Sequence, residues 1–393
     1  MSYTRLLAIT ISFVAFSEMA NAFCLSGSPN YKQCVRNEAA SDIEAMGGKN
    51  FDGSMSSLER LAQLGNKTAQ RWLANKYYLG DNIKGDKFLA AKLYSAAASQ
   101  GDVNSKLQLA FMYSLGEGVP KDDEKATEIY RSLAEQGDKE GERHLGNAYA
   151  KGTGILKNKD LAIKWLVQAA NHGNIEAYLD IASIYNASGS STEEKNAALK
   201  WLMAAADSGD TKGQAALAYF YHYQKDFKDI SASIKWYKKA AEQGDIHSTV
   251  QLGKIYNSDE IDKKDKMSSL QYLSIAAEKD DGYAAYLLAE LYQEEEFPLK
   301  DKKVAAKWYA VAAKHDFGPA AYRLGIMYSK GDGVPKSYEL AYQWLSIAAS
   351  QADEQFFADV RDDAEKKLTK SQLVHAQALA NRCIKSEYKD CGG

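Results

Sequence analysis

Small apolar residues return along this chain at an almost constant interval. A pair of aliphatic residues, most often two alanines, occurs nine times, at Leu61-Ala62, Ala97-Ala98, Leu133-Ala134, Ala169-Ala170, Ala205-Ala206, Ala240-Ala241, Ala276-Ala277, Ala312-Ala313 and Ala348-Ala349. Successive pairs lie 36 residues apart, except for one step of 35. A period of this length is typical of stacked helical units that bury their apolar faces against their neighbours. We therefore predict an all-α fold, an α-α superhelix (solenoid) of eight to nine antiparallel helical hairpins of about 36 residues.

The first helix of each predicted hairpin follows a slot where glycine ends the preceding helix. The slot holds Gly65, Gly101, Gly137, Gly173, Gly209 and Gly244, and later Asp280 and Asp316. Four positions after the slot stands a small residue, eight after it Leu or Ile, nine after it Ala or Gly, and twelve after it tyrosine in all eight units. Positions four, eight and twelve share one helical face, so we expect the recurring tyrosines to belong to the core.

The second helix carries a large residue four positions before the alanine pair, which we expect to anchor the hairpin. This position holds Leu93, Ile129, Trp165, Trp201, Trp236, Tyr272, Trp308 and Trp344. Three positions earlier stands Ala or Ser in every unit. Large side chains opposite small ones let two helices approach to about 8–9 Å.

Together these motifs resemble the Sel-one-like repeat, a relative of the tetratricopeptide repeat. The string Gly-Asp-x-x-small-x-x-x-Leu-Gly/Ala-x-x-Tyr leads to Gly-x-Gly-Val-Pro, as at 116–120 and 331–335, and then to Lys-Trp-x-x-x-Ala-Ala-x-x-Gly. We interpret the Gly-x-Gly loops as turns rather than anion sites. The resemblance covers about residues 54–352, and it implies an adaptor that brings proteins together, often in bacterial secretion, envelope or signalling contexts.

The N-terminal residues differ from the repeats. Arg5 precedes an apolar stretch over residues 6–16, and Ala20-Asn21-Ala22 provides a small-x-small cleavage site. This pattern is typical of a secretory signal peptide, and the stretch is too short to span a bilayer. We expect cleavage after Ala22, periplasmic or secreted localisation, and no membrane insertion. The expected organisation is a signal peptide at 1–22, an N-terminal cap at 23–53, the solenoid at 54–352, and a C-terminal capping helix with a disulfide tail at 353–393.

All four cysteines lie outside the repeats, at Cys24, Cys34, Cys383 and Cys391. Four cysteines allow three pairings. Stacked hairpins would hold the two ends many tens of ångströms apart, at about 8–10 Å per helix layer, so the local pairs Cys24–Cys34 and Cys383–Cys391 are favoured. Disulfides agree with an oxidising compartment. Between the last repeat and Cys383, Thr369-x-x-Gln372 is a candidate capping box for the closing helix.

The sequence offers no pattern for catalytic, cofactor-binding or metal-binding residues, and we expect none of them. The six histidines lack metal-ligand spacing, and the nucleophile elbow, phosphate loop and His-Glu-x-x-His motifs do not occur. One Ser-x-x-Lys, from Ser386 to Lys389, stands without companion motifs, as chance allows. A net charge of −3 without a basic stripe argues against a nucleic-acid partner.

Positions ten and fourteen after the slot vary from unit to unit, and we call them the variable face. Its pairs are Asn75/Leu79, Phe111/Leu115, Asn147/Lys151, Ser183/Ala187, Tyr219/Tyr223, Lys254/Ser258, Glu290/Glu294 and Ile326/Lys330. Core packing does not require a face that accepts both Phe and Glu. Phe111, Leu115, Tyr219 and Tyr223 are therefore candidate protein-binding residues, since Tyr is a frequent interface anchor. The competing interpretation is that these side chains only touch the adjoining helix or loop.

Two functional hypotheses follow. The first is a non-enzymatic periplasmic scaffold that grips a partner protein in the groove of the superhelix, either as an immunity protein against a secreted toxic effector such as a lipase or as an envelope regulator. The second is a cell-wall or β-lactam-acting hydrolase of the cysteine-rich repeat type. Relatives of that type carry a cysteine pair in each repeat, which this chain lacks. The partner's identity and the oligomeric state stay open.

Overall fold

A computed structural model describes residues 54–393 apart from 82, 188, 262–264, 352–354, 387, 389–390 and 392–393. These residues form nineteen α-helices and one short 3-10 helix, with no strand among them, so the prediction of an all-α repeat solenoid is confirmed. The predicted signal peptide, the N-terminal cap and the Cys24–Cys34 pair lie outside the described residues.

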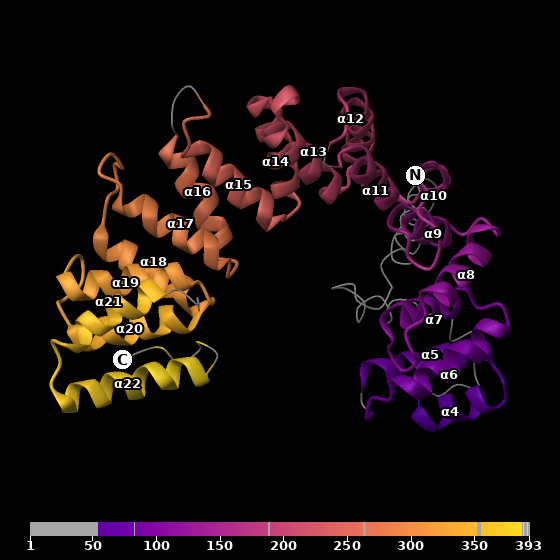
Figure 1. The fold of residues 1–393 in the computed structure, drawn as a ribbon, viewed down its shortest axis with the longest axis horizontal. Helices are drawn as coiled ribbons and strands as arrows, with labels where there is room; N and C mark the ends of the chain where they lie inside the picture. Colours follow the sequence, from indigo (N-terminus) through magenta and orange to yellow (C-terminus); the bar gives the residue numbers. More distant parts are fainter. Residues whose placement is uncertain are drawn as a thin grey trace, which may run out of the picture. The chain divides into compact units, whose positions relative to one another are not determined.

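The chain divides into two compact units, with the boundary in the sequence between Ser208 and Gly209. From α4 to α21, helices that follow one another in the sequence pack side by side within each unit (Figure 1). The helices of the first unit are α4 (Met55–Gln63), α5 (Lys67–Leu79), α6 (Lys87–Ser99), α7 (Val103–Leu115), α8 (Asp123–Ala134), α9 (Lys139–Lys151), α10 (Lys159–Asn171), α11 (Ile175–Tyr185) and α12 (Thr192–Asp207).

The second unit continues the same alternation of first and second helices. Its elements are α13 (Thr211–Tyr223), η2 (Lys225–Phe227), α14 (Ile230–Glu242), α15 (Ile246–Tyr256), α16 (Lys266–Ala277), α17 (Gly282–Gln293), α18 (Lys302–Lys314), α19 (Gly318–Lys330), α20 (Tyr338–Gln351), α21 (Gln355–Glu365) and α22 (Lys370–Lys385). The 3-10 helix η2 occupies the loop in which one repeat is a residue shorter than the others.

Each first helix except α19, which follows Phe317, begins at a side-chain cap directly after the slot. The slot glycines have φ between 78° and 92°, the left-handed region that glycine adopts without strain. The next residue, Asp or Asn, accepts a hydrogen bond from the backbone N–H three positions on, as Asp102 does from Ser105 at 2.7 Å. Asp280 and Asp316 take the same left-handed conformation in the later repeats.

The recurring tyrosine lies where the first helix ends, and its backbone holds the turn closed. The Tyr77 carbonyl accepts a hydrogen bond from the N–H of Asp86, the residue that caps α6, at 2.9 Å. The same bond forms at Tyr113, Tyr149, Tyr221, Tyr256, Tyr292 and Tyr328. The rings are half-buried and most pack against the edges of the apolar clusters.

The centre of each hairpin is filled by the residue after the predicted anchor. Every residue at this position is buried: Tyr94, Tyr130, Leu166, Leu202, Tyr237, Leu273, Tyr309 and Leu345. Seven of the eight predicted anchors are only partly buried, with Trp344 the exception. The predicted anchor was thus one residue early, because one helical step of about 100° moves it from the hairpin centre to the neighbouring repeat. Trp201, for example, packs against the cluster that holds Leu166 and Ala169 of the preceding hairpin.

A small residue of the first helix faces this central side chain. A Cβ added to Gly146 would lie 2.7 Å from Cγ of Leu166, and one added to Gly253 would lie 2.6 Å from Cγ of Leu273. Where the central residue is Tyr, the sequence has Ala at this place, as in the Ala218 and Tyr237 hairpin. In each hairpin, the size of the central side chain on the second helix therefore corresponds to the small residue that faces it on the first helix.

The second glycine of the Gly-x-Gly turn touches the preceding repeat. A Cβ added to Gly118 would lie 2.1 Å from the carbonyl oxygen of Lys87, in the first turn of α6. Gly154 and Gly333 approach Asp123 and Lys302 in the same way. This turn therefore serves as a backbone contact between repeats, which agrees with its interpretation as a turn.

The C-terminal end contains two helices beyond the repeats, whereas the sequence predicted one. Both α21 and α22 pack against α20. Thr369 begins α22 with the predicted capping box to Gln372. Cys383 in α22 and Cys391 form a disulfide with their Cα atoms 4.5 Å apart, and both are buried. Over the described part of the chain, no helix is both long and apolar enough to cross a bilayer.

Candidate protein-binding surface

Much of the variable face is occupied by contacts inside each unit. The Asn75 amide oxygen accepts a hydrogen bond from the buried Tyr94 hydroxyl at 2.5 Å. Asn147 donates to Asp180 of the next first helix at 2.8 Å, and Arg323 of α19 pairs with Glu290 of α17 at 3.2 Å. At these positions the side chains contact an adjoining element, as the competing interpretation of the variable face predicted.

The first unit presents a small apolar spot next to a charged network. Leu115 at the end of α7 is 54% exposed, and Phe111 one turn earlier is half-buried. On the following first helices, Arg143 pairs with Glu176 at 2.5 Å and with Asp180 at 2.6 Å. These ion pairs link α9 to α11.

The second unit presents a group of exposed tyrosines. Tyr219 and Tyr223, one turn apart on α13, are 51% and 47% exposed, and their ring centroids lie 4.5 Å apart. Tyr283 on α17 is 40% exposed, and Lys254 Nζ of α15 lies 5.9 Å from its ring centroid. We call these residues, with Gln251 of α15, the tyrosine surface.

Tyr223 is held in place from two sides. Its hydroxyl donates to the Gln251 side-chain oxygen at 3.3 Å, and its ring stacks on His222 with centroids 4.2 Å apart. His222 is itself buried, with Nε2 2.6 Å from a Glu260 carboxylate oxygen. Lys228 donates to the other oxygen of Glu260 at 2.7 Å. This chain of contacts orders the ring before any partner arrives.

The electrostatics of the surface favour the neutral form of the Tyr223 hydroxyl. Partial burial raises the pKa of the Tyr223 hydroxyl, and nearby Tyr219 and Glu260 raise it further. Desolvation opposes ionisation of Glu260, but hydrogen bonds from Lys228 and His222 outweigh it and lower the pKa of that carboxyl. The Tyr223 hydroxyl therefore stays protonated at neutral pH.

Sequence reasoning named Tyr219 and Tyr223 but missed Tyr283 and Gln251. Tyr283 precedes Glu290 of the variable face by seven residues, which is two helical turns and therefore the same face. The signal was present in the helical spacing. Tyr283 stands three positions after its slot, outside the positions ten and fourteen that define the variable face.

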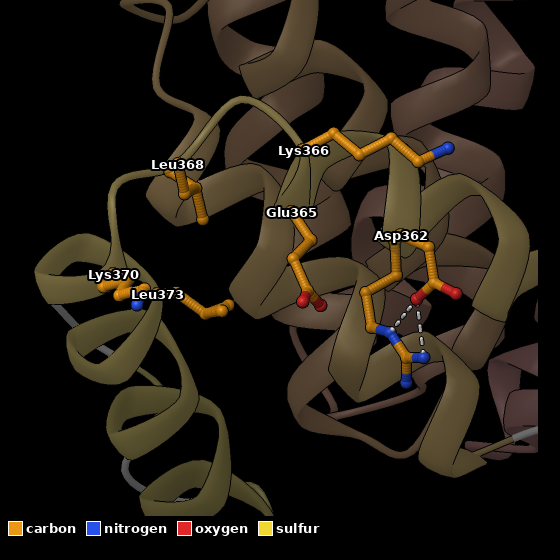
Figure 2. A pocket seen from close by; sticks show the side chains of 7 residues that line it. Asp362, Glu365, Lys366, Leu368, Lys370 and Leu373 are labelled. Atoms are coloured by element: carbon orange, nitrogen blue, oxygen red, sulfur yellow. Dashed lines mark hydrogen bonds and ion pairs between the residues drawn. The ribbon is translucent and has the colours of Figure 1, made fainter.

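The second unit also contains an open cleft between α21 and α22 (Figure 2). Its volume is about 550 Å³, and its lining residues are Arg361, Asp362, Glu365, Lys366, Leu368, Lys370 and Leu373. Glu365 and Leu373 extend toward one another from the two helices (Figure 2). Arg361 pairs with Asp362 at 2.7 Å and Lys366 with Asp363 at 2.8 Å, so these charges are compensated locally. The lining contains no histidine, cysteine or hydroxyl-bearing side chain.

The Ser-x-x-Lys motif and the possible metal ligands form no catalytic or metal site in the part of the chain that the structure describes. Ser386 ends α22, and its hydroxyl donates to the Cys383 carbonyl at 2.8 Å. Lys389, its partner in the Ser-x-x-Lys motif, lies outside the described residues. No cluster of three or more His, Cys, Asp or Glu side chains within the described segments has the arrangement of a metal site.

Stacked helical hairpins that expose side chains on their first helices define a helical-repeat protein. The Sel1 repeat model matches residues 67–102, 104–138, 139–174, 175–210, 211–245, 247–281, 282–317 and 318–353. The chain therefore belongs to the Sel1 repeat family. Sel1 repeats generally serve as non-enzymatic scaffolds that mediate protein–protein interactions.

Solved structures agree with this assignment. The chain is 28% identical to c5321, a protective antigen present in uropathogenic Escherichia coli strains with an SLR fold, over 95% of this chain and 85% of that one, with a TM-score of 0.55. It is 26% identical to a Sel1 repeat protein from Oxalobacter formigenes, over 84% of this chain and 94% of that one, with a TM-score of 0.58.

A more distant structure is the immunity protein Pa5087 from Pseudomonas aeruginosa. It is 20% identical over 52% of this chain and 81% of that one, with a TM-score of 0.36, which is too low to carry an argument about function. No curated protein matches the chain.

Proposed function

We propose that this protein is an exported, non-enzymatic scaffold that binds a partner protein on the exposed side of its first helices. The observation that carries the proposal is the tyrosine surface. Tyr219, Tyr223 and Tyr283 are close to half exposed, although large aromatic rings on a repeat protein are normally used for packing. Ordered, exposed tyrosines are frequent anchors of protein interfaces.

Export is supported by two features. The N-terminal sequence has the charge, apolar stretch and small-residue cleavage site of a signal peptide. The Cys383–Cys391 disulfide agrees with an oxidising compartment. Fractionation followed by N-terminal sequencing tests this part: the mature protein should be recovered from the periplasm and begin at Phe23. An intact Met1 terminus in the cytoplasm contradicts it.

Affinity capture tests the binding function. The wild-type protein and the Tyr219→Ala/Tyr223→Ala variant are immobilised, incubated with periplasmic extract and compared by quantitative mass spectrometry. We expect the variant to recover the partner at least about tenfold less, since truncated anchors cost about 2 kcal/mol or more. Met267→Ala, which removes an equally exposed side chain from the second helix α16, is the matched control. Equal recovery by the double variant and the wild type contradicts the proposal.

Two narrower roles are distinguished by the captured partner. A secreted toxic effector, such as a lipase, among the captured proteins supports an immunity role. A component of envelope maintenance supports a regulatory role.

A further inference from the structure

The chemistry of the tyrosine surface restricts how a partner chain can lie on it. The surface is built on helices, whose backbone N–H and C=O groups are already paired, so it offers no strand edge for main-chain pairing. Recognition must therefore come from side chains. Two of the recurring peptide modes use apolar or aromatic side chains of this kind: an amphipathic helix in an apolar groove, or an extended polyproline II segment on aromatic rings.

The exposed side chains favour the second mode. A docked helix needs a broad groove of aliphatic side chains, but the exposed rings here are tyrosines that carry hydroxyls. Tyr223 is fixed by Gln251 and His222, so it presents a rigid ring to a partner. A polyproline II segment is also rigid before binding, and its backbone carbonyls are free to accept hydrogen bonds from the Tyr219 and Tyr283 hydroxyls, since that of Tyr223 already donates to Gln251.

The length of the surface agrees with such a segment. The tyrosines lie on α13 and α17, two first-helix steps apart, with Gln251 and Lys254 on α15 between them. At about 8–10 Å per step, the span is about 20 Å. A polyproline II segment rises about 3.1 Å per residue, so six or seven residues cover that span.

The charge of the surface specifies one further feature of the partner. Lys254 has no carboxylate within ion-pair distance among the described residues, and its ammonium lies 5.9 Å from the Tyr283 ring centroid. The Glu260 carboxylate close to Tyr223 is already compensated, because it binds His222 and Lys228. A partner that places a carboxylate beside Lys254 would complete this site.

We propose that the tyrosine surface binds an extended, proline-rich segment that carries an acidic side chain opposite Lys254. The inference rests on the proposed scaffold function and names the chemistry of its partner. Proline rings stack on Tyr219 and Tyr283, the Tyr223 ring supports that of Tyr219, and a glutamate or aspartate pairs with Lys254.

The test uses synthetic peptides and the whole mature protein. The probe is a peptide of about twelve residues, proline-rich with a glutamate at every third position, which places the carboxylates along one side of a helix with three residues per turn. Binding is measured by fluorescence anisotropy of the labelled peptide. A Gly-Ser peptide with the same glutamates, a lysine-for-glutamate proline peptide and an amphipathic leucine helix serve as comparisons.

We expect the proline-glutamate peptide to bind best, and Tyr219→Ala and Tyr283→Ala each to weaken it about tenfold. Lys254→Glu should also weaken it about tenfold and should bind the proline-lysine peptide better than the wild type does. Met267→Ala and Lys303→Glu, on the second helices α16 and α18, are controls that should change neither affinity. Circular dichroism melts of each variant verify that the fold is retained.

Several results overturn the inference: no binding of the proline-glutamate peptide, equal binding of the Gly-Ser peptide, tighter binding of the leucine helix, or indifference to the tyrosine and Lys254 variants. If the tyrosine variants lose partner capture from extract while no proline peptide binds, the partner chemistry is wrong and the scaffold function stands. If the peptide binds through the tyrosines while capture is unchanged, the scaffold function is contradicted instead.

Discussion

At the scale of single residues, the first unit buries a histidine that the repeat pattern did not single out. His144 on α9 is partly buried, its Nε2 is enclosed without a hydrogen-bond partner, and its ring stacks on Tyr130 with centroids 4.6 Å apart. Desolvation, assisted by the nearby Arg143 charge, lowers the pKa of the His144 imidazole to about 4. The ring is therefore neutral in the folded protein at pH 7.

This shift predicts a loss of stability in mild acid. The unfolded chain takes up a proton at His144 near pH 6.5, but the folded chain does so only near pH 4, so the free energy of unfolding falls as the pH drops through that window. At pH 4.5 the loss should reach about 2 kcal/mol. Urea unfolding at pH 7 and pH 4.5 measures it.

The control for this prediction is His144→Phe, which keeps an aromatic ring against Tyr130 but removes the titrating group. Buried Glu140 has a raised pKa, chiefly through desolvation, and its contribution to stability changes with pH in the opposite direction. The comparison must therefore be between variant and wild type at each pH. A variant with an undiminished acid sensitivity would exclude His144 as the cause.

At the scale of the helical hairpin, stability depends on matched side-chain sizes. Gly253 faces Leu273 and Gly325 faces Leu345, with added Cβ atoms 2.6 and 2.7 Å from the leucine Cγ. The hairpin with Ala182 and Leu202 departs from this pairing, and Leu202 is slightly more exposed there, at 6%. We therefore expect the helix pairs to tolerate exchange of the two residues together better than exchange of either one.

A double-mutant cycle tests this matching. Gly253→Ala should lower the free energy of unfolding by about 1–3 kcal/mol, because Leu273 has no room to move away. Adding Leu273→Tyr recreates the combination of Ala218 with Tyr237 and should recover part of the loss, with a coupling of at least about 0.5 kcal/mol. Chemical denaturation of the four proteins gives the coupling. Strictly additive losses of unfolding free energy would show that the side chains at positions 253 and 273 are not energetically coupled.

The same hairpins show which parts of the fold and of the binding surface can be predicted from the sequence. The alanine pairs, slot glycines and capping Asp and Asn residues predicted the helices, because each depends on local geometry that repeats every 36 residues. The anchor was misplaced by one residue, since Trp201 and its equivalents look like core residues but pack between repeats. The tyrosine surface was found only in part, because Gln251 and Tyr283 become its members through contacts across three helices.

At the scale of the whole molecule, the chain consists of two compact units, each with apolar clusters of its own. The cluster around Leu166 and Ile181 belongs to the first unit, whereas Leu273 contributes to a cluster of the second that extends as far as Cys383 and Cys391. In repeat proteins, stability is approximately a sum of local terms. Damage in one unit should therefore stay largely within it.

Hydrogen exchange tests this independence. Leu273→Ala should lower the free energy of opening by about 2–4 kcal/mol for amides of the second unit, while amides around Leu166 keep their protection. Leu166→Ala should give the reverse pattern. Mass spectrometry of peptides from both units reads out the difference. An equal loss of protection along the whole chain would mean that the units unfold together.

The Gly-x-Gly turns also bear on how such a chain can change length. Gly118 and its equivalents press against the backbone of the preceding repeat, so a residue inserted there would push two hairpins apart. The turn after α13 lacks this glycine pair, contains η2 instead, and belongs to the repeat that is one residue short. Turns of that second kind are where natural variation or protein engineering can add, remove or graft segments while the register of the remaining hairpins is preserved.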